Sequence, residues 1–258
     1  MLKNKKGIIF GIANDHSIAW GMAKKIAENG AEIAICYQNE TFLKRVKPLA
    51  EKINSNLLVK CDFSEKNSIK KCFDEIKKKY NKIDFVIHAA AYSDKNELNG
   101  KYLNTSKENF INTLNISCFS FTEIAKEASK IMNKGGSLLT LSFYGSTKVM
   151  PNYNVMGVAK AALETSVKYL SVDLGNQEIR VNAVSAGPMR TLAGAAITNA
   201  REVYNYTQTN SALKRNVSLE ELGNTALYFV SDLSRSVTGE THYVDCGFNI
   251  IGMPSNNN

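Results

Sequence analysis

Residues 7–21 read Gly7-Ile-Ile-Phe-Gly-Ile-Ala-Asn-Asp-His-Ser-Ile-Ala-Trp-Gly21. The stretch opens with a short run of apolar and β-branched residues, which is typical of a buried strand. Gly11 can make a tight turn out of that strand, and Ser17 stands where the N-cap of a following helix is expected. Gly21 can then let the helix pack closely on the sheet. We therefore predict a strand, a turn and a helix at the start of the chain.

The same alternation of strand and helix patterns continues along the chain. Short runs rich in β-branched residues recur, separated by segments with apolar residues at helical spacing. The predicted strands are Gly7–Gly11, Glu32–Tyr37, Leu57–Cys61, Phe85–Ala89, Ser137–Ser142, Arg180–Ser185 and Thr241–Asp245. Single helices between strands imply βαβ units and a parallel sheet covered on both faces. We expect a single α/β domain over residues 1–253, with a doubly wound, Rossmann-like sheet of seven parallel strands.

Two segments stand outside this pattern. Residues 188–214 form a long stretch between strands with weak periodicity, which is typical of a lid or binding loop, so we expect a substrate loop there. Residues 254–258 are expected to form a disordered tail. Ligands of doubly wound sheets bind outside the carboxyl ends of the strands. Functional residues are therefore expected just after each predicted strand.

The composition narrows the class of protein. The chain has 258 residues, 44% hydrophobic and 22% charged, which suits one globular domain. No stretch approaches the ~20 apolar residues of a membrane span, and the N-terminal residues lack the apolar core of a signal peptide. We expect a cytoplasmic protein without membrane insertion. Five scattered cysteines include no Cys-x-x-Cys pair and the three histidines lie far apart, so neither a disulfide framework nor a metal site is indicated.

The formal net charge of +8 raises the question of an acidic partner. The densest cationic groups, Lys44-Arg45-Lys47 and Lys77-Lys78-Lys79, fall on helical patterns. Two interpretations stay open, because these groups suit either solvated helix faces or a docking surface for something acidic. Nothing in the sequence resembles a nucleic-acid-binding motif.

The turns after the first three predicted strands can hold a dinucleotide. A serine hydroxyl and free N–H groups at a helix N-terminus favour a phosphate, although the turn from Gly11 is not G-x-G-x-x-G and the spacing alone is weakly specific. Gln38 is neither the acid that binds a ribose nor the arginine that holds a 2′-phosphate, and the lack of a cation beside it favours NADH over NADPH. Asp62 could accept a hydrogen bond from an adenine amino group or could cap a turn.

Tyr153 and Lys160 stand seven residues apart on a helix predicted to begin near Asn152. Residues at this spacing differ by only about 20° in azimuth, so the two side chains share one face. An ammonium there can hold ribose hydroxyls and favour a phenol that donates a proton or hydrogen bond. On spacing alone, a chance pairing of a partly buried tyrosine with a surface lysine is the simpler interpretation.

Several motifs occur in a fixed order along the chain. They are Gly-x5-Ser-Ile-Ala from Gly11, Gln38, Asp62, Tyr-x6-Lys from Tyr153, and the runs Pro151–Gly157, Arg180–Pro188, Thr238–Glu240 and Val244–Gly247. Together these motifs resemble the bacterial enoyl-acyl carrier protein reductases (NADH), divergent members of the short-chain dehydrogenase/reductase superfamily. The resemblance covers Gly7 to about Met253. It implies reduction of the trans-2 double bond of an enoyl thioester by hydride transfer from NADH in fatty acid elongation, with an acidic acyl carrier protein as partner and a homotetrameric assembly.

The resemblance also implies roles for individual residues. Tyr153 and Lys160 would be catalytic, and Lys160 would also bind the nicotinamide ribose. The other cofactor-binding residues would be Gly11, Ser17, Ile18, Gln38, Asp62, Phe63, Ala90, Met189, Arg190, Thr191, Leu192 and Ala193. The acyl substrate would contact Ser93, Tyr92, Leu98, Phe143, Met156 and Ile197.

Two departures from the family pattern stand out. Phe143 occupies the position ten residues before the catalytic tyrosine where many members carry a second tyrosine, which puts a second tyrosine's role in doubt. The family's Ser-Ile-Gly-Phe-Ala after the fourth strand is replaced by the run Ala89–Ser93, which alters the shelf beside the cofactor.

Two alternatives to this function were weighed against the residues. A carbonyl (3-ketoacyl) reductase of the same superfamily would need hydroxyls at Met156 and Phe143, and both are missing. Ser142 is one residue out of register, so we expect it on the opposite face of the strand. A non-catalytic dinucleotide-binding protein predicts loss of the tyrosine–lysine pair, and both residues are present.

Overall fold

A seven-stranded sheet forms the centre of the molecule. In a computed structural model, which describes residues 1–195 and 198–253, the strands run parallel in the order β3-β2-β1-β4-β5-β6-β7. They are β1 (Lys6–Phe10), β2 (Glu32–Tyr37), β3 (Leu57–Lys60), β4 (Ile83–His88), β5 (Met132–Ser142), β6 (Arg180–Ala186) and β7 (Thr241–Val244). The predicted doubly wound fold is confirmed. β5 is longer than predicted, because it begins at Met132 instead of Ser137 and joins β4 through an irregular register.

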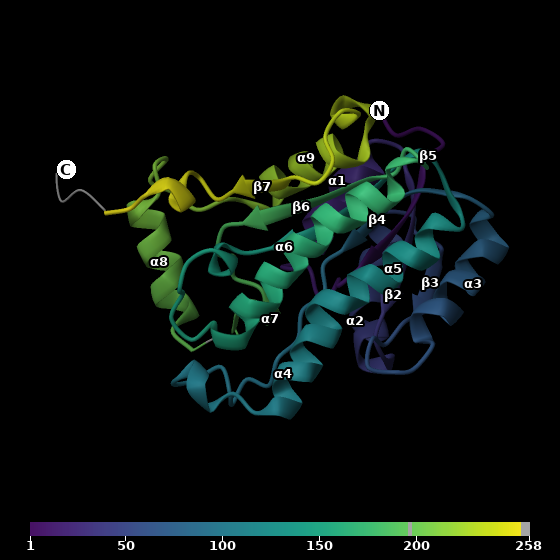
Figure 1. The fold of residues 1–258 in the computed structure, drawn as a ribbon. Helices are drawn as coiled ribbons and strands as arrows, with labels where there is room; N and C mark the ends of the chain where they lie inside the picture. Colours follow the sequence, from purple (N-terminus) through teal and green to yellow (C-terminus); the bar gives the residue numbers. More distant parts are fainter. Residues whose placement is uncertain (196–197, 254–258) are drawn as a thin grey trace.

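Helices cover both faces of this sheet. Within the described ranges they are α1 (Ile18–Glu28), α2 (Glu40–Lys52), α3 (Ser68–Tyr80), α4 (Lys107–Leu114), α5 (Ser120–Ser129), α6 (Asn154–Gly175), α7 (Leu192–Ala195), α8 (Ala200–Asn210) and α9 (Leu219–Val230). The helices α3, α5 and α6 pack on one face, and α1, α2 and α9 on the other. Figure 1 shows α8 beyond the arrowheads of β6 and β7, at the end of the sheet where ligands are expected.

The alternation of side chains along β1 explains how one strand supports two cores. Ile8 and Phe10 belong to the core under α3, α5 and α6, whereas Ile9 belongs to the core under α1, α2 and α9. Successive side chains of a strand point to opposite faces, so a continuous apolar run is needed when both faces are covered. β6 is buried at every position for the same reason. Both cores run through one sheet, which is why the chain folds as a single domain.

Gly21 has a different role from the one predicted. A Cβ atom at Gly21 would lie 2.7 Å from the carbonyl oxygen of Leu219, and one at Gly223 would lie 2.8 Å from that of Gly21. The two glycines therefore let the backbones of α1 and α9 come into direct contact. The prediction that Gly21 allows close packing on the sheet is wrong, because its open side faces α9.

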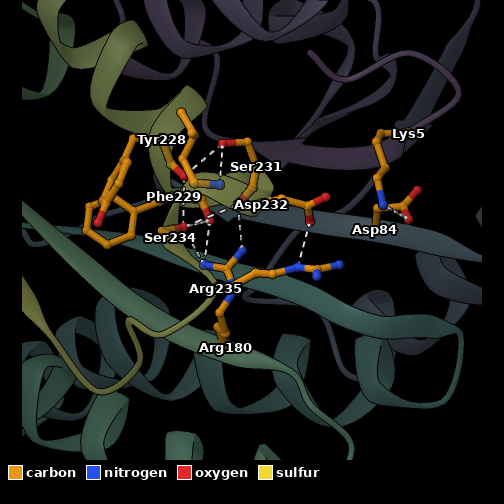
Figure 2. Close-up of polar contacts among 10 residues, drawn as sticks. Lys5, Asp84, Arg180, Tyr228, Phe229, Ser231, Asp232, Ser234 and Arg235 are labelled. Atoms are coloured by element: carbon orange, nitrogen blue, oxygen red, sulfur yellow. Dashed lines mark hydrogen bonds and ion pairs between the residues drawn. The ribbon is translucent and has the colours of Figure 1, made fainter.

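Arg180, the first residue of β6, holds the end of α9 in place. Its side chain is 6% exposed and donates hydrogen bonds to the carbonyl oxygens of Phe229 (2.8 Å) and Ser231 (3.2 Å) and to the hydroxyl of Ser234 (2.6 Å) (Figure 2). The last carbonyl groups of a helix lack partners within the helix. A cation at this end also matches the helix dipole. Arg180 therefore serves as a buried C-terminal cap supplied by a neighbouring strand.

Residues 188–214 are not a plain loop. The described part contains α7 and α8, so the weak sequence periodicity concealed two helices. α7 is only four residues long, and α8 has one fully buried residue, Thr207, which explains the faint apolar pattern. The predicted tail at residues 254–258 and the predicted contact residue Ile197 lie outside the described residues. In the described ranges, no helix combines the length and apolar character that crossing a membrane requires.

Candidate active site

Two adjoining cavities open at the carboxyl ends of the strands. The Tyr153 cavity, of about 610 Å³, is lined by the segment after β4, by the ends of β5 and β6, by α6, by residues between 187 and 194 and by α8, and both Tyr153 and Lys160 line it. The Asp62 cavity, of about 590 Å³, is lined from the ends of β1, β2 and β3. Residues 89–92 line both cavities and form the wall between them. The strand order reverses between β1 and β4, which is where a doubly wound sheet opens its binding crevice.

Gly11 makes the sharp exit from β1 that gives access to the crevice. Its φ is +97°, and a Cβ atom there would lie 2.2 Å from the carbonyl oxygen of Ala89. Only glycine tolerates both the conformation and the close approach. The turn therefore keeps the backbone of β1 and β4 in near contact and leaves room above them for a ligand.

Ser17 supports this turn instead of capping α1 with its side chain. Its hydroxyl accepts hydrogen bonds from the backbone N–H groups of Ala13 (3.0 Å) and Asn14 (3.1 Å). Ser17 occupies the N-cap position of α1, but its side chain makes no capping hydrogen bond. The first N–H groups of α1 are thus left without a side-chain cap, which suits an anion at this helix end.

The far end of the Asp62 cavity is polar. One carboxylate oxygen of Asp62 accepts hydrogen bonds from the backbone N–H (2.9 Å) and hydroxyl (2.7 Å) of Ser64. The other accepts from the side-chain amide of Gln38 at 3.1 Å. Burial raises the pKa of Asp62, but these hydrogen bonds outweigh it and hold the pKa below its ordinary value. Asp62 therefore does cap a turn, and it stays ionised beside Gln38 in the cavity wall.

Tyr153 is buried at the start of α6 and stays protonated. Its side chain is 7% exposed, and its ring meets that of Phe143 edge to face with 4.9 Å between centroids. Burial, and then the charge of Glu164, raise the pKa of Tyr153 well above its ordinary value. A Cβ atom at Gly145 would lie 2.4 Å from the tyrosine ring, so the glycine makes room for it. The phenol is therefore suited to donate a hydrogen bond.

Lys160 lines the same cavity, seven residues further along α6. Its side chain is 5% exposed and its ammonium donates to the carbonyl oxygen of Leu141 at 2.7 Å. Burial lowers the pKa of Lys160 to about 8, while the nearby Cys118 and Glu164 oppose that shift. An ammonium has three donors, so one contact to Leu141 leaves capacity for the hydroxyl groups of a ligand.

Glu164 ties the turn after β5 to α6. Its carboxylate accepts hydrogen bonds from the hydroxyls of Ser142 and Ser146, the latter at 2.6 Å. Phe143 lies between these two serines, so this clamp also fixes the ring that packs on Tyr153. Ser142 and Phe143 both line the Tyr153 cavity. The expectation that Ser142 faces the opposite side is therefore not met, although Glu164 takes its hydroxyl.

A π-helical turn, η2 (Asn115–Phe119), holds the wall between the cavities. The hydroxyl of Ser117 accepts from the backbone N–H of Tyr92 (2.9 Å) and lies 3.0 Å from its carbonyl oxygen as a donor. Single π-helical turns recur at functional sites. Beneath the wall, His88 is fully buried between Thr140 and Ser120, and burial with the charge of Lys160 lowers its pKa to about 3. His88 is therefore neutral.

The structure brings most of the predicted site residues to these cavities. Of the predicted residues, the Tyr153 cavity is lined by Ile18, Ala90, Tyr92, Ser93, Leu98, Phe143, Tyr153, Met156, Lys160, Met189 and Thr191. The Asp62 cavity is lined by Gly11, Gln38, Asp62, Phe63, Ala90, Tyr92 and Leu192. The hydroxyl of Ser93 is engaged with Asn109 and Thr113, so it faces the pocket wall as well as the cavity.

Some predicted residues lie elsewhere, and others were missed. Ser17 and Arg190 line neither cavity, and the Arg190 guanidinium lies over the ring of Tyr204 at 4.4 Å. Ala193 falls in α7, and Ile197 lies outside the described residues. Glu164, Ser117 and His88 were missed because no local spacing marks them. Among the described residues, no group of three or more His, Cys, Asp or Glu side chains could hold a metal ion.

Comparison with known proteins gives one consistent result. The model of a family described as enoyl-(acyl carrier protein) reductase matches residues 11–249. A curated relative from Rhizobium meliloti, named enoyl-(acyl-carrier-protein) reductase (NADH) 2, is 57% identical over 255 residues, covering 99% of this chain and 95% of the relative.

Solved structures agree with the sequence comparison. An enoyl-(acyl-carrier-protein) reductase from Anaplasma phagocytophilum, in complex with NAD, is 54% identical with a TM-score of 0.95, covering 98% of this chain and 97% of that one. FabI from Candidatus Liberibacter asiaticus is also 54% identical, with a TM-score of 0.96 and 98% of each chain covered.

Proposed function

The chain belongs to the enoyl-(acyl carrier protein) reductase family, and from that premise we propose how its residues perform the reaction. It reduces the trans-2 double bond of an enoyl thioester carried on acyl carrier protein, with NADH as cofactor, in fatty acid elongation. The observation that carries the proposed mechanism is the pairing of a protonated Tyr153 with a buried Lys160 in one cavity, which adjoins a second cavity of similar size.

The residues present fit NADH. The turn at Gly11, with its φ of +97°, and the start of α1 suit the pyrophosphate. The first N–H groups of α1 have no side-chain cap, so an anion can bind there. Gln38 and Asp62 suit the polar edge of the adenosine, and Phe63 its flat face. Lys160 would bind the nicotinamide ribose, and Met189 and Thr191 would bound the nicotinamide end. When bound, NADH supplies the hydride that reaches the β-carbon of the substrate.

Tyr153 acts as the donor to the thioester oxygen. Hydride addition to the β-carbon places negative charge on that oxygen, and a hydrogen bond there stabilises the transition state more than the ground state. The raised pKa of Tyr153 keeps its proton in place at neutral pH. Lys160 contributes a positive charge close to the same centre, where low solvent access strengthens the interaction.

Reversible carbonyl chemistry is disfavoured by the same cavity. Met156 and Phe143, which stand where a ketone reductase would need hydroxyls, both line the Tyr153 cavity as apolar walls. Ser142 is bound to Glu164, so its hydroxyl is already a donor elsewhere. An apolar wall suits an acyl chain, because burying it gains about 0.8 kcal/mol per methylene.

Residues between 187 and 194 form a wall of the Tyr153 cavity together with Ala200 and Val203 of α8. Three exposed cations stand in or next to the lining, with Arg190 beside Met189, Arg201 beside Ala200 and Lys95 in the lining itself. They outnumber the acids at the same places, which are Asp94 and Glu202. An acidic carrier protein that delivers the acyl chain would meet positive charge at this mouth. The net charge of +8 agrees with that polarity.

A homotetramer accounts for an exposed apolar stripe. Tyr169 and Val172 on α6 are 72% and 78% exposed, and Val158 falls on the same helix face at 37%. Phe119 and Ile111, from the neighbouring η2 and α4, are each 53% exposed. Large exposed apolar side chains on neighbouring elements are typical of an interface between chains. Tyr169→Glu should reduce the sedimenting mass below that of four chains, and a wild-type monomer at micromolar concentration would contradict the assembly.

The proposed activity is tested in one assay. The purified protein should oxidise NADH in the presence of crotonyl-acyl carrier protein, and Tyr153→Phe should lower turnover by about 10²-fold, the usual effect of losing one such donor. Acetoacetyl-acyl carrier protein is the control substrate. Turnover with the acetoacetyl but not the crotonyl thioester would overturn the assignment.

A further inference from the structure

Tyr153 is flanked by two asparagines with left-handed backbone conformations. The φ angles are 58° at Asn152 and 39° at Asn154, and Asn154 is the first residue of α6. Residues other than glycine rarely adopt positive φ, and asparagine tolerates it best. Such conformations persist only where surrounding contacts hold them, and they cluster at functional sites.

The side chains of these two asparagines bind two different segments beside the Tyr153 cavity. The amide of Asn154 donates to the carbonyl oxygens of Leu98 (3.0 Å) and Gly100 (3.2 Å), in the segment after β4. The amide of Asn152 donates to the carbonyl oxygen of Thr198 at 3.1 Å, just before α8. The two segments also meet directly, because the hydroxyl of Thr198 donates to the side chain of Asn99.

Asn154 binds the backbone of Leu98, whose side chain packs beside Tyr153. Leu98 is 3% exposed and packs with Tyr153, Val155 and Met156 in a small core separate from the two cores of the sheet. It also lines the Tyr153 cavity. Leu98 belongs to a segment without strand or α-helix between β4 and η1 (Tyr102–Asn104), so the hydrogen bonds from Asn154 add a polar link to the packing that joins this segment to Tyr153.

We propose that Asn152 and Asn154 are positioning residues that brace two segments beside the Tyr153 cavity against Tyr153, and that Asn154, through Leu98, limits the length of acyl chain accepted. The proposal rests on the enoyl reductase function proposed above. The left-handed backbone at both asparagines directs their side-chain amides away from Tyr153. The unusual φ angles and the hydrogen bonds of the amides are therefore parts of the same arrangement.

Two variants separate the clamp from the backbone. Asn154→Gly keeps positive φ accessible and removes the amide, and Asn154→Asp keeps the shape but sets a carboxylate against two carbonyl oxygens. Both should raise KM for a crotonyl thioester by about fivefold to tenfold, the loss expected for one neutral hydrogen bond or slightly more. A dodecenoyl thioester should be affected less, so the ratio of kcat/KM values shifts toward the longer chain. The Kd for NADH should stay within about twofold of wild type, because the cofactor contacts are untouched.

Asn81→Gly is the matched control. Asn81 has a φ of 57°, lies exposed at the end of α3, and touches neither cavity. It should leave the chain-length ratio unchanged. An unchanged ratio of kcat/KM values in both Asn154 variants would overturn the proposed limit on chain length. An equal loss of kcat/KM for both substrates, accompanied by weaker NADH binding, would overturn it as well.

Hydrogen exchange of residues 95–101 tests the brace without activity. Exchange there should quicken in Asn154→Gly and Asn154→Asp but not in Asn81→Gly, because the first two release the segment. Unchanged exchange would overturn the brace. A wild-type protein that fails to reduce any enoyl thioester would instead contradict the proposed function, and the exchange result would still decide whether Asn154 holds this segment.

Discussion

Two buried cations stand at opposite ends of the β5–β6 strand pair and differ in how they are held. Arg180 pairs in register with Ser137 at the start of the pair and donates to three acceptors at the end of α9. Lys160 reaches Leu141 near the carboxyl end and donates to that one carbonyl. Their exposures are nearly equal, at 6% and 5%.

The difference shows that a buried cation has a structural role at the start of the β5–β6 pair and a functional role at its carboxyl end. A planar guanidinium surrounded by carbonyls suits a fixed structural contact. An ammonium with a single acceptor keeps two donors for a ligand, and burial lowers its pKa to about 8. Burial lowers the pKa of Arg180 as well, so the difference between the two cations is that Lys160 lines a cavity and Arg180 does not. Groups with shifted pKa values in a cavity are typical of functional sites. Replacing each cation by methionine should therefore have opposite consequences.

Lys160→Met should have the largest effect on activity. Removing the charge beside Tyr153 and the donors for the ribose should lower kcat/KM for NADH by roughly 10²–10³-fold. Steady-state kinetics with crotonyl-acyl carrier protein measures the change, and Lys168→Met, an exposed lysine on the same helix, is the control. Unchanged NADH affinity would remove Lys160 from its proposed role.

Arg180→Met should have the largest effect on stability. It removes three buried hydrogen bonds that a charged group donates, although the carbonyl of Phe229 keeps the hydroxyl of Ser137 as a donor. The loss should lower the free energy of unfolding by about 3 kcal/mol. Turnover per folded molecule should change little, because Arg180 lines neither cavity. Urea unfolding measures the loss, with Arg235→Met as an exposed control that keeps the cap of α9. Equal stability of the two variants would contradict the capping role.

The sequence predicts one of these cations far better than the other. Lys160 stands in a recognisable Tyr-x6-Lys motif on a helix, and Gly11 follows an apolar strand, so local spacing suffices to find both. The partners of Arg180 lie 49, 54 and 51 residues further along the chain. No local pattern reports contacts of that separation.

The same limit explains what else was missed at the site. Glu164 is joined to Ser142 and Ser146 across a turn, and Ser117 reaches Tyr92 only because of a π-helical turn. The left-handed backbone on either side of Tyr153 has no sequence signal beyond asparagine itself. α8 was missed because its apolar face is narrow, with the cavity taking up part of it.

Lys160→Met should also stabilise the protein. The folded pKa of about 8 lies below the ordinary 10.5, so burying the charged amine disfavours folding at pH 7. Methionine removes that penalty but also gives up the hydrogen bond to Leu141, so we expect a net gain on the order of 2 kcal/mol. The gain should shrink between pH 8 and about 10.5, because there the folded wild-type lysine has released the proton that the unfolded chain still binds. Urea unfolding at pH 7 and pH 10 checks both statements, and a loss of stability at pH 7 would refute them.

The affinity for NADH should fall as the pH rises through about 8. Only the protonated amine of Lys160 carries the charge that holds the cofactor, and its population drops about tenfold for each pH unit above the pKa. Bound NADH is anionic and raises the pKa of the charged amine. The fall with rising pH, called the basic limb of the profile, should therefore appear at higher pH in kcat than in kcat/KM. Fluorescence titration of NADH between pH 6.5 and 9.5 measures the limb. A flat profile in wild type would contradict its assignment to Lys160.

Glu164→Gln should move that limb by the smallest amount. The charge of Glu164 raises the pKa of Lys160, opposing the larger effect of burial, so its removal should shift the limb to lower pH by less than about one unit. Glutamine keeps an oxygen that can accept from Ser142 and Ser146, so the turn that holds Phe143 should stay in place. The double variant Ser142→Ala with Ser146→Ala is the converse control, because it breaks the clamp and keeps the charge. If the double variant shifts the pH dependence of NADH binding and Glu164→Gln does not, Glu164 acts by holding the turn and not by its charge. The lowered pKa of Lys160 would then be due to burial alone.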